Sequence, residues 1–232
     1  MSERHRLKRL TAWRYLLALP RSIWFNFRHL PLRQAWHLPV LLSHRTVVES
    51  AAGSLVITCP ELRIGLVKIG FSTYQQTDFR FDRTRLNLRG KLLISGECDF
   101  GAGSCLHITD SGVLTVGKLV HIGPKSLLLC NKGITLGDRV LMSWCCTLMD
   151  TDQHNLIDSQ GRIANADREI VLGENVWVGC HSIIVKGTHI APDCTIGAGS
   201  VVHGRHEEPR TVLSGNPAQI VKRDVMLMKS EL

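Results

Sequence analysis

Residues 172–202 read LGENVWVGCHSIIVKGTHIAPDCTIGAGSVV. An aliphatic residue occupies every sixth position of this stretch, namely Leu172, Val178, Ile184, Ile190, Ile196 and Val202. A period of six fits neither an α-helix nor one long strand, but it fits short strands that each turn one large side chain inward. Three such strands joined by tight turns close one triangular coil, and stacked coils lie about 4.8 Å apart, as strands do in any sheet. This stretch therefore predicts an all-β fold of stacked coils.

The same phase extends upstream of residue 172 and defines three further runs. They place large apolar residues six positions apart, at Ile94, Phe100 and Leu106, at Val116, Ile122 and Leu128, and at Leu136, Met142 and Leu148. Glycine follows the aliphatic residue at Gly117, Gly123, Gly137, Gly173, Gly179 and Gly197. Narrow corners of a coil favour such small residues, so the repeat predicts one continuous core along the central part of the chain.

The repeat unit is an aliphatic residue, Gly, two variable positions and a small residue, and it resembles that of the hexapeptide-repeat acyltransferases. Residues 196–202 (IGAGSVV) and 214–218 (SGNPA) resemble the C-terminal signature of that family. The resemblance covers about residues 64–222 and implies a left-handed parallel β-helix. Residues 142–154, 157–161, 176–179, 24–28 and 38–40 resemble, more narrowly, the bacterial polysaccharide O-acetyltransferases. Similarity to maltose and galactoside acetyltransferases is more distant.

We expect three parts along the chain. Residues 1–45 form a basic amphipathic helical arm, residues 46–220 form the left-handed β-helix, and residues 221–232 form a tail with a short C-terminal helix. The net charge of +8 belongs to the arm, because residues 1–45 hold nine Lys and Arg against one acid and the rest of the chain is balanced.

The arm also carries apolar residues at helical spacing. Leu16, Leu19, Ile23 and Phe27 follow one another at three- and four-residue steps, and Pro20 is expected to kink the helix or begin a new one. Two roles stay open for this side of the arm. It contacts an anionic membrane surface, or it packs on its own coil or on a neighbouring subunit.

The repeat has one long interruption. Leu148 and Leu172 are 24 residues apart, and the sixth positions between them hold His154, Gln160 and Ala166. Residues at about 151–169 therefore leave the coil as a polar loop, and loops on rigid scaffolds commonly carry function. The pattern makes His154 either a base suited to proton transfer near neutral pH or one more polar loop residue. The family resemblance implies the general base.

Two acidic and two aromatic residues complete the expected catalytic region. Asp150 and Asp152 are each candidates to orient the imidazole or to bind the acceptor sugar. Asp152 is assigned to the first role and Asp150 to the second, with turn capping as the alternative for both. Trp144 and Trp177 are expected to bind the acceptor, with packing between coils as the alternative. No protein nucleophile is needed, because a thioester donor is already activated.

The resemblance implies acetyl-CoA as the acyl donor, bound along the coil edge near the C-terminal turns. Small residues at Gly179, Ala198 and Gly199 would let the pantetheine arm approach closely. Asn216, Lys222 and Arg223 follow the last coil and would meet the phosphates, with a solvated helix start as the alternative for the last two. We expect no metal site, and the sequence contains no Walker-type phosphate loop.

Eight cysteines are scattered without a C-x-x-C pair. This pattern predicts buried thiols in a reducing compartment rather than a zinc site. Cys145 and Cys146 lie near the loop in sequence, but adjacent strand residues point to opposite faces, so at most one of them faces a site. The sequence shows no convincing secretory signal and no run of eighteen uncharged apolar residues. We expect a cytoplasmic protein, located at or near the inner face of the membrane.

Together these features predict an acetyl-CoA-dependent O-acetyltransferase that acts on a sugar hydroxyl of a surface polysaccharide or its lipid-linked precursor. The resemblance implies a homotrimer with sites shared between subunits. We expect a saccharide acceptor and no nucleic-acid partner. Two alternatives stay open: an N-acyltransferase of a nucleotide-linked amino sugar, and a non-catalytic trimeric scaffold at the membrane.

Overall fold

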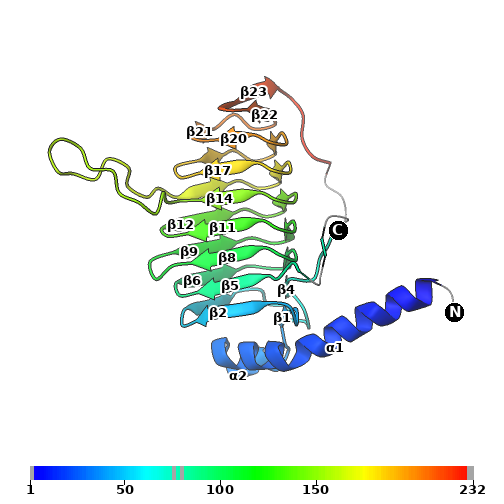
Figure 1. Ribbon diagram of the computed structural model, residues 1–232. Helices are drawn as coiled ribbons and strands as arrows, with labels where there is room; N and C mark the ends of the chain where they lie inside the picture. Colours follow the sequence, from blue (N-terminus) through cyan, green and yellow to red (C-terminus); the bar gives the residue numbers. More distant parts are fainter. Residues whose placement is uncertain (1–2, 75–76, 79–80, 229–232) are drawn as a thin grey trace.

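The computed structural model describes residues 3–74, 77–78 and 81–228, with side chains from residue 13 onward. Its strands form three parallel sheets, which make the three sides of a left-handed β-helix. The long helix α1 (Glu3–His29) and the short helix α2 (Leu32–Ala35) lie beneath the first coil, as Figure 1 shows.

The chain visits the three sheets in turn, once in each coil. Sheet A contains β1 (Val40–Leu42), β4 (Val67–Ile69), β7 (Cys98–Phe100), β10 (Val120–Ile122), β13 (Leu141–Met142), β16 (Trp177–Val178), β19 (Thr195–Ile196), β22 (Val212–Gly215) and β23 (Ala218–Lys222). Sheet B contains β2 (Val47–Ala51), β5 (Arg85–Leu88), β8 (Cys105–Ile108), β11 (Leu127–Cys130), β14 (Thr147–Met149), β17 (Ile183–Val185) and β20 (Val201–Val202). Sheet C contains β3 (Ser54–Ile57), β6 (Lys91–Ile94), β9 (Val113–Val116), β12 (Gly133–Leu136), β15 (Ile170–Leu172), β18 (His189–Ile190) and β21 (Arg205–His206).

The aliphatic positions of the six-residue repeat all point into the coil. In sheet B, Leu128 pairs with Leu106 of the coil below and Leu148 of the coil above, and all three are completely buried. The corresponding positions of the other two sheets are also buried, from Ile94 to Val202. Each buried side chain of this size contributes about 1.5–3 kcal/mol. The predicted core is confirmed.

The glycines after the aliphatic positions lie where one coil touches the next. A Cβ on Gly123 would come within 2.5 Å of the backbone of Ser143, and one on Gly137 within 2.7 Å of the backbone of Gly173. No side chain fits at these distances without displacing the neighbouring coil. The glycine phase of the repeat is therefore a condition for stacking at strand spacing.

Both ends of the β-helix differ from the sequence-based prediction. The coils begin with β1 at Val40, six residues ahead of the predicted start at residue 46, because links of irregular length hide the repeat there. The short C-terminal helix is wrong over the described residues, since residues 218–222 form β23, antiparallel to β22, and residues 223–228 are not helical. The tail runs back down the outside of the coils in Figure 1.

Helix α1 covers the open edge of sheet A. Asn26 Nδ2 donates to the carbonyl oxygen of Val40 at 2.7 Å, and its Oδ1 accepts from the Val40 amide at 3.1 Å. Ser22 Oγ accepts from the amide of Leu42 at 2.9 Å. These contacts satisfy backbone groups of β1 that would otherwise form an unpaired strand edge.

The side of α1 that packs on the coil is not the side marked by apolar spacing. The buried residues are Ala18, Ser22, Phe25 and Asn26, whereas Leu16 and Ile23 of the predicted apolar stripe are exposed. The helix continues through Pro20. Among the described residues, no helix is long and apolar enough to span a membrane.

Candidate functional site

The loop between β14 and β15 projects from the corner at which sheet B passes to sheet C, as Figure 1 shows. Its two arms are joined by an isolated antiparallel bridge between Ile157 and Ile163. Near the tip, Asp158 accepts hydrogen bonds from the amides of Gln160 and Arg162. The loop is therefore an ordered excursion from the coil with its own internal contacts.

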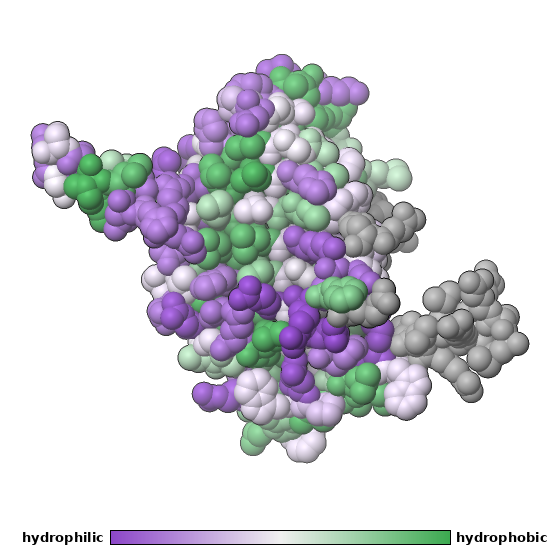
Figure 2. All heavy atoms as spheres, in the orientation of Figure 1, coloured by the Kyte–Doolittle hydropathy of each residue, from purple (hydrophilic) through white to green (hydrophobic). Residues whose placement is uncertain are grey.

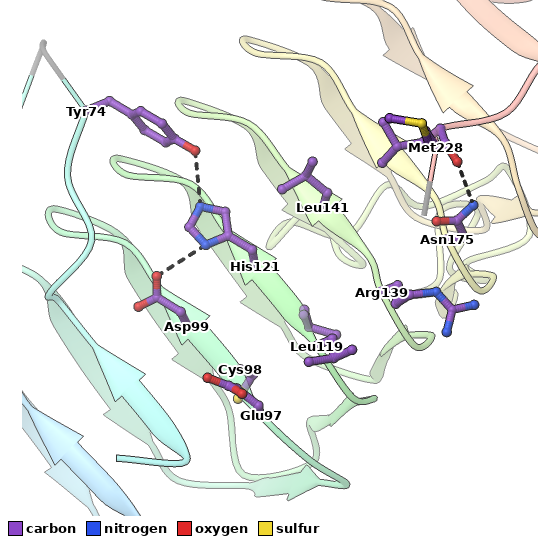
Figure 3. A pocket seen from close by; sticks show the side chains of 12 residues that line it. Tyr74, Glu97, Cys98, Asp99, Leu119, His121, Arg139, Leu141, Asn175 and Met228 are labelled. Carbon is purple, nitrogen blue, oxygen red and sulfur yellow. Dashed lines mark hydrogen bonds and ion pairs between the residues drawn. The ribbon is translucent and has the colours of Figure 1, made fainter. Parts of the chain in front are cut away.

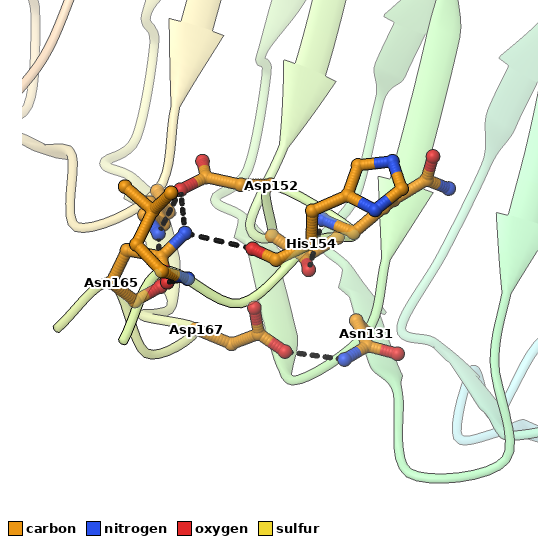
Figure 4. Close-up of polar contacts among 9 residues, drawn as sticks. Asn131, Asp152, His154, Asn165 and Asp167 are labelled. Carbon is orange, nitrogen blue, oxygen red and sulfur yellow. Dashed lines mark hydrogen bonds and ion pairs between the residues drawn. The ribbon is translucent and has the colours of Figure 1, made fainter. Parts of the chain in front are cut away.

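Asn165 holds the part of the loop that carries His154 (Figure 4). Its Nδ2 donates to the main-chain oxygen of His154 at 2.8 Å and to Asp152 Oδ2 at 2.7 Å. Its Oδ1 accepts from the Leu156 amide at 2.6 Å. The side chain of His154 is exposed and points away from this cluster.

Asp152 anchors the loop to the coil above and does not contact the imidazole. Its Oδ2 lies 2.5 Å from Nζ of Lys186, which follows β17. The hydrogen bond from Lys186 and the one from Asn165 lower the pKa of the Asp152 carboxyl. Asp152 is therefore linked to the backbone of His154 through Asn165, and its predicted role in orienting the ring stays a prediction.

Asn131 and Asp167 lie at the base of the loop and were not identified from the sequence. Asn131 Nδ2 donates to Asp167 Oδ2, and Thr109 Oγ1 donates to Asn131 Oδ1 at 2.6 Å. Asn131 precedes β12, at the same corner one coil below the loop. The sequence signal for Asn131 is that it directly follows Cys130, whose side chain points into the coil. This places Asn131 at a corner.

The structure corrects the role predicted for Asp150. The residue is completely buried, and its two carboxylate oxygens accept from the backbone amides of Asn131, Lys132 and Gly133 at 2.6–2.9 Å. Neither oxygen is open to a sugar. Asp150 instead fixes the turn between β11 and β12, which was the alternative reading of this residue.

Replacing Asp150 with Ala should lower the free energy of unfolding by about 3 kcal/mol, because three buried amides lose a charged acceptor. Urea unfolding measures this change. Asp110→Ala is the control, since Asp110 forms an exposed ion pair with Arg89 and should change stability by less than about 0.5 kcal/mol. A fully stable Asp150→Ala protein with a raised acceptor KM would restore the sugar-binding role.

The two predicted tryptophans lie on the far side of the coil from the loop. Trp177 is the outward residue of β16 in sheet A, and its Nε1 donates to Ser143 Oγ at 3.2 Å. Trp144 lies in the turn from sheet A to sheet B, and its ring centroid is 5.5 Å from that of Tyr74. Both tryptophans lie within one coil of the level at which the loop leaves.

The residues predicted to meet the donor have different environments. Ala198 and Gly199 are exposed at the sheet A to sheet B corner, and a Cβ on Gly199 would meet nothing within 4 Å. Gly179 is buried, and a Cβ there would lie 2.6 Å from the amide nitrogen of Ala198. Stacking of the coils therefore explains Gly179, and its role in admitting the donor stays a prediction.

The last predicted donor residues lie beyond the final turn. Asn216 and Lys222 are exposed at the two ends of the β22–β23 hairpin region, and Arg223 Nε donates to Glu208 Oε1 at 2.8 Å. Exposed amide and ammonium groups on a rigid hairpin are suited to phosphate oxygens. Together with the open corner at Gly199, these residues stay the predicted contacts of the donor.

A second histidine site on sheet A was not identified from the sequence (Figure 3). His121 Nδ1 lies 3.2 Å from Asp99 Oδ2, and its Nε2 lies 3.5 Å from the hydroxyl of Tyr74. Asp99 and His121 each precede an inward residue, Phe100 and Ile122, so the period of six places both on the outer face of sheet A. The sequence therefore contained the signal for this pair.

The thiols near the loop are not set up as nucleophiles. Cys146 is completely buried, and burial raises its pKa to about 11. Burial also raises the pKa of Cys145. Neither thiol is ionised near neutral pH, which agrees with direct transfer that uses no protein nucleophile.

Comparisons with known proteins agree with the repeat and the coil. A family model described as bacterial transferase hexapeptide (six repeats) matches residues 169–204. An uncharacterised 24.8 kDa protein in the cps region of Klebsiella pneumoniae is 26% identical over 86% of this chain and 86% of that protein. A galactoside O-acetyltransferase of Escherichia coli is 29% identical over 53% of this chain and 56% of that enzyme.

The solved structure of a polysialic acid O-acetyltransferase, OatWY, has the same fold. It matches 78% of this chain and 90% of its own at a TM-score of 0.54 and 18% identity. The chain is thus a left-handed β-helix protein of the hexapeptide-repeat type that resembles the bacterial O-acetyltransferases.

Proposed function

We propose that this protein transfers an acetyl group from acetyl-CoA to a sugar hydroxyl of a surface polysaccharide or its lipid-linked precursor. The observation that carries the proposal is the ordered loop at residues 151–169, which holds an exposed His154 outside an otherwise regular coil. The similarity to a galactoside O-acetyltransferase supports acyl transfer to a saccharide.

The transfer requires one proton to move and one acyl bond to be exchanged. His154 accepts the proton of the acceptor hydroxyl as its oxygen attacks the thioester carbonyl carbon. The C–S bond then breaks, and the imidazolium returns the proton to the departing thiolate of coenzyme A. The protein's further contribution is to hold both substrates in line, which is worth several kcal/mol in such reactions.

Replacing His154 with Ala should lower kcat by a factor of about 100 or more, because the general base is lost. The dissociation constant of coenzyme A should stay within about twofold, since the imidazole does not bind the donor. Thiol release with a soluble glycan measures turnover, and the alkali lability of the product distinguishes an ester from an amide. Gln160→Ala is the matched control, as an exposed polar residue of the same loop. Near-normal turnover of the His154 variant would exclude this assignment.

We further propose that the active protein is a homotrimer with three shared sites. The proposed base lies at the corner between sheets B and C, whereas Trp144, Ala198 and Gly199 lie at the corner between sheets A and B. One chain therefore carries two halves of a site on different corners, at similar heights along the β-helix axis. In a trimer related by threefold rotation, the loop of one chain would lie against the corner between sheets A and B of the neighbouring chain.

Apolar side chains lie where this assembly would need them. The loop tip exposes Leu156, Ile157 and Ile163, each by more than half. The outer face of sheet B carries Leu127, Leu129, Met149, Ile183, Val185 and Val201, and Figure 2 shows apolar side chains along the face toward the viewer. Contact with a second and a third copy would bury both surfaces.

Light scattering should give a mass about three times that of the 25.9 kDa chain. Mixing and reassembling His154→Ala and Trp177→Ala proteins should restore activity, because roughly a quarter of random interfaces then pair two native half-sites. Either variant alone should stay inactive. An active monomer, or a mixture with no more activity than its parts, would contradict the shared site.

We also propose that the exposed side of α1 contacts an anionic membrane. Trp13, Leu17 and Trp24 lie on one side of the helix and are at least half exposed, although other residues of α1 pack on the coil. Seven of the nine basic residues of the arm belong to α1, but Arg14 and Arg21 donate to the main-chain oxygens of Phe71 and Thr46. Each of the other five would contribute about 1 kcal/mol near an anionic surface. This placement would bring the catalytic domain close to a lipid-linked sugar.

The full-length protein should sediment with anionic vesicles at low salt and much less at high salt. Changing Trp13, Leu17 and Trp24 together to Ala should abolish sedimentation while a short soluble acceptor is still acetylated. Thermal unfolding checks that the packed side of α1 is intact in this variant. Equal sedimentation of the variant and the native protein would exclude this membrane contact.

A further inference from the structure

The outer face of sheet A contains a cavity of about 450 Å³ that the proposed chemistry leaves unused. Its polar side includes Asp99, His121 and Tyr74, and its apolar side includes Leu119, Leu141 and Met228 (Figure 3). We propose that this cavity binds a neutral sugar ring of the acceptor next to the site of transfer. The inference rests on the proposed acetyltransferase function and identifies the chemistry of its acceptor subsite.

The coil register builds the polar side of the cavity. Asp99 and His121 are directly paired on neighbouring strands β7 and β10, so their side chains emerge side by side. The Asp99 carboxylate lies 3.2 Å from Nδ1 and holds the ring with Nε2 toward the cavity. Nε2 has only the long 3.5 Å contact with the Tyr74 hydroxyl, so a sugar hydroxyl can take its place.

The aromatic side chains suit the flat apolar face of a pyranose. The ring of Tyr74 lies perpendicular to His121 at a centroid distance of 6.2 Å and meets Trp144 at 5.5 Å. Small-ligand sites typically combine apolar walls with a few placed polar groups, and aromatic rings with a polar edge serve both purposes. A sugar has the same division, with C–H groups on its faces and hydroxyls at its rim.

The charges around the cavity favour a neutral ring over an acidic one. Arg139 is paired with Glu174, and Glu97 with Arg63, so these four charges balance. Asp99 adds a negative charge beside His121 with both side chains about four-fifths covered. Among the described residues that line the cavity, the only Lys or Arg is Arg139, which Glu174 already pairs; Lys68 stands beside Asp99 on β4 but is not part of the lining. A second carboxylate brought into this space would be repelled by Asp99 and would lose hydration.

The cavity and the proposed transfer site lie at neighbouring heights along the β-helix axis. Its lining comes from β7, β10 and β13, and the loop that carries His154 leaves the coil that begins with β13. Tyr74 links the cavity to Trp144 at the corner between sheets A and B. A ring bound here would direct the rest of an acceptor chain toward that corner.

The test measures sugar binding by the full-length protein without a donor, using calorimetry or saturation-transfer NMR. Methyl glycosides of galactose, glucose and mannose are the neutral probes, and N-acetylneuraminic acid is the acidic probe. We expect at least one neutral probe to bind and the acidic probe to bind more weakly. His121→Leu and Tyr74→Ala should each weaken neutral-sugar binding at least about tenfold, whereas Tyr74→Phe keeps the ring and should lose less.

His107→Leu is the matched control, because His107 is an outward, half-buried histidine on sheet B away from the cavity. This variant should bind sugar as the native protein does, and all variants should keep the native affinity for acetyl-CoA. Failure of every neutral probe to bind, equal binding by the His121 variant, or stronger binding of the acidic probe would overturn the proposal. Normal sugar binding with no acetyl transfer to any glycan would instead reject the proposed function and keep the sugar site.

Discussion

Coil-to-coil hydrogen bonding at strand spacing is the constraint on which the rest of this molecule depends. Every strand of sheets A, B and C takes its partners from the coils above and below, so each coil must follow the last without a gap. The corners then come so close that Gly123 and Gly137 have no room for a Cβ. The same constraint leaves unpaired edges at the ends of each sheet. In sheet A, Asn26 and Ser22 of α1 cover the edge of β1, and antiparallel β23 pairs with β22.

A coil built this way has little freedom inside, so its chemistry lies outside. The inward positions are filled by aliphatic side chains, and the corners are limited by contact between coils. Two kinds of position escape these limits: insertions at a corner, and outward residues of the strands. His154 occupies the first kind, and Asp99 and His121 occupy the second. Insertions at a corner and outward residues of the strands can therefore vary while the β-helix stays the same.

The sequence predicted what the six-residue period controls and little of what it does not. The inward residues from Ile94 to Val202 and the loop after Leu148 follow from the period alone. Strand β1 was assigned to the arm because the repeat is irregular there. Asp150 was misassigned because a buried carboxylate on three amides looks, in sequence, like any loop acid.

Helix α1 shows the same limit in another form. Its packed side includes Ser22 and Asn26, which form hydrogen bonds to β1. Of the four residues marked by apolar spacing, Leu16 and Ile23 are exposed, and Leu19 and Phe27 are only partly buried. A pattern of hydrophobic residues identifies burial against an apolar surface. It does not identify a helix whose polar side chains cap a strand edge, because that contact is made by hydrogen bonds to unpaired backbone groups.

The split between the two corners also restricts how copies can meet. The loop with His154 and the corner with Trp144 belong to the same coil, so they stand at one height along the β-helix axis. In the proposed assembly, a neighbour reached by pure rotation keeps this height, and each loop then meets a corner of the matching coil. A neighbour displaced along the axis by even one coil, about 4.8 Å, would place His154 against a different turn. A shared site in this fold therefore requires a closed rotational ring, whose symmetry leaves no loop and no corner without its partner.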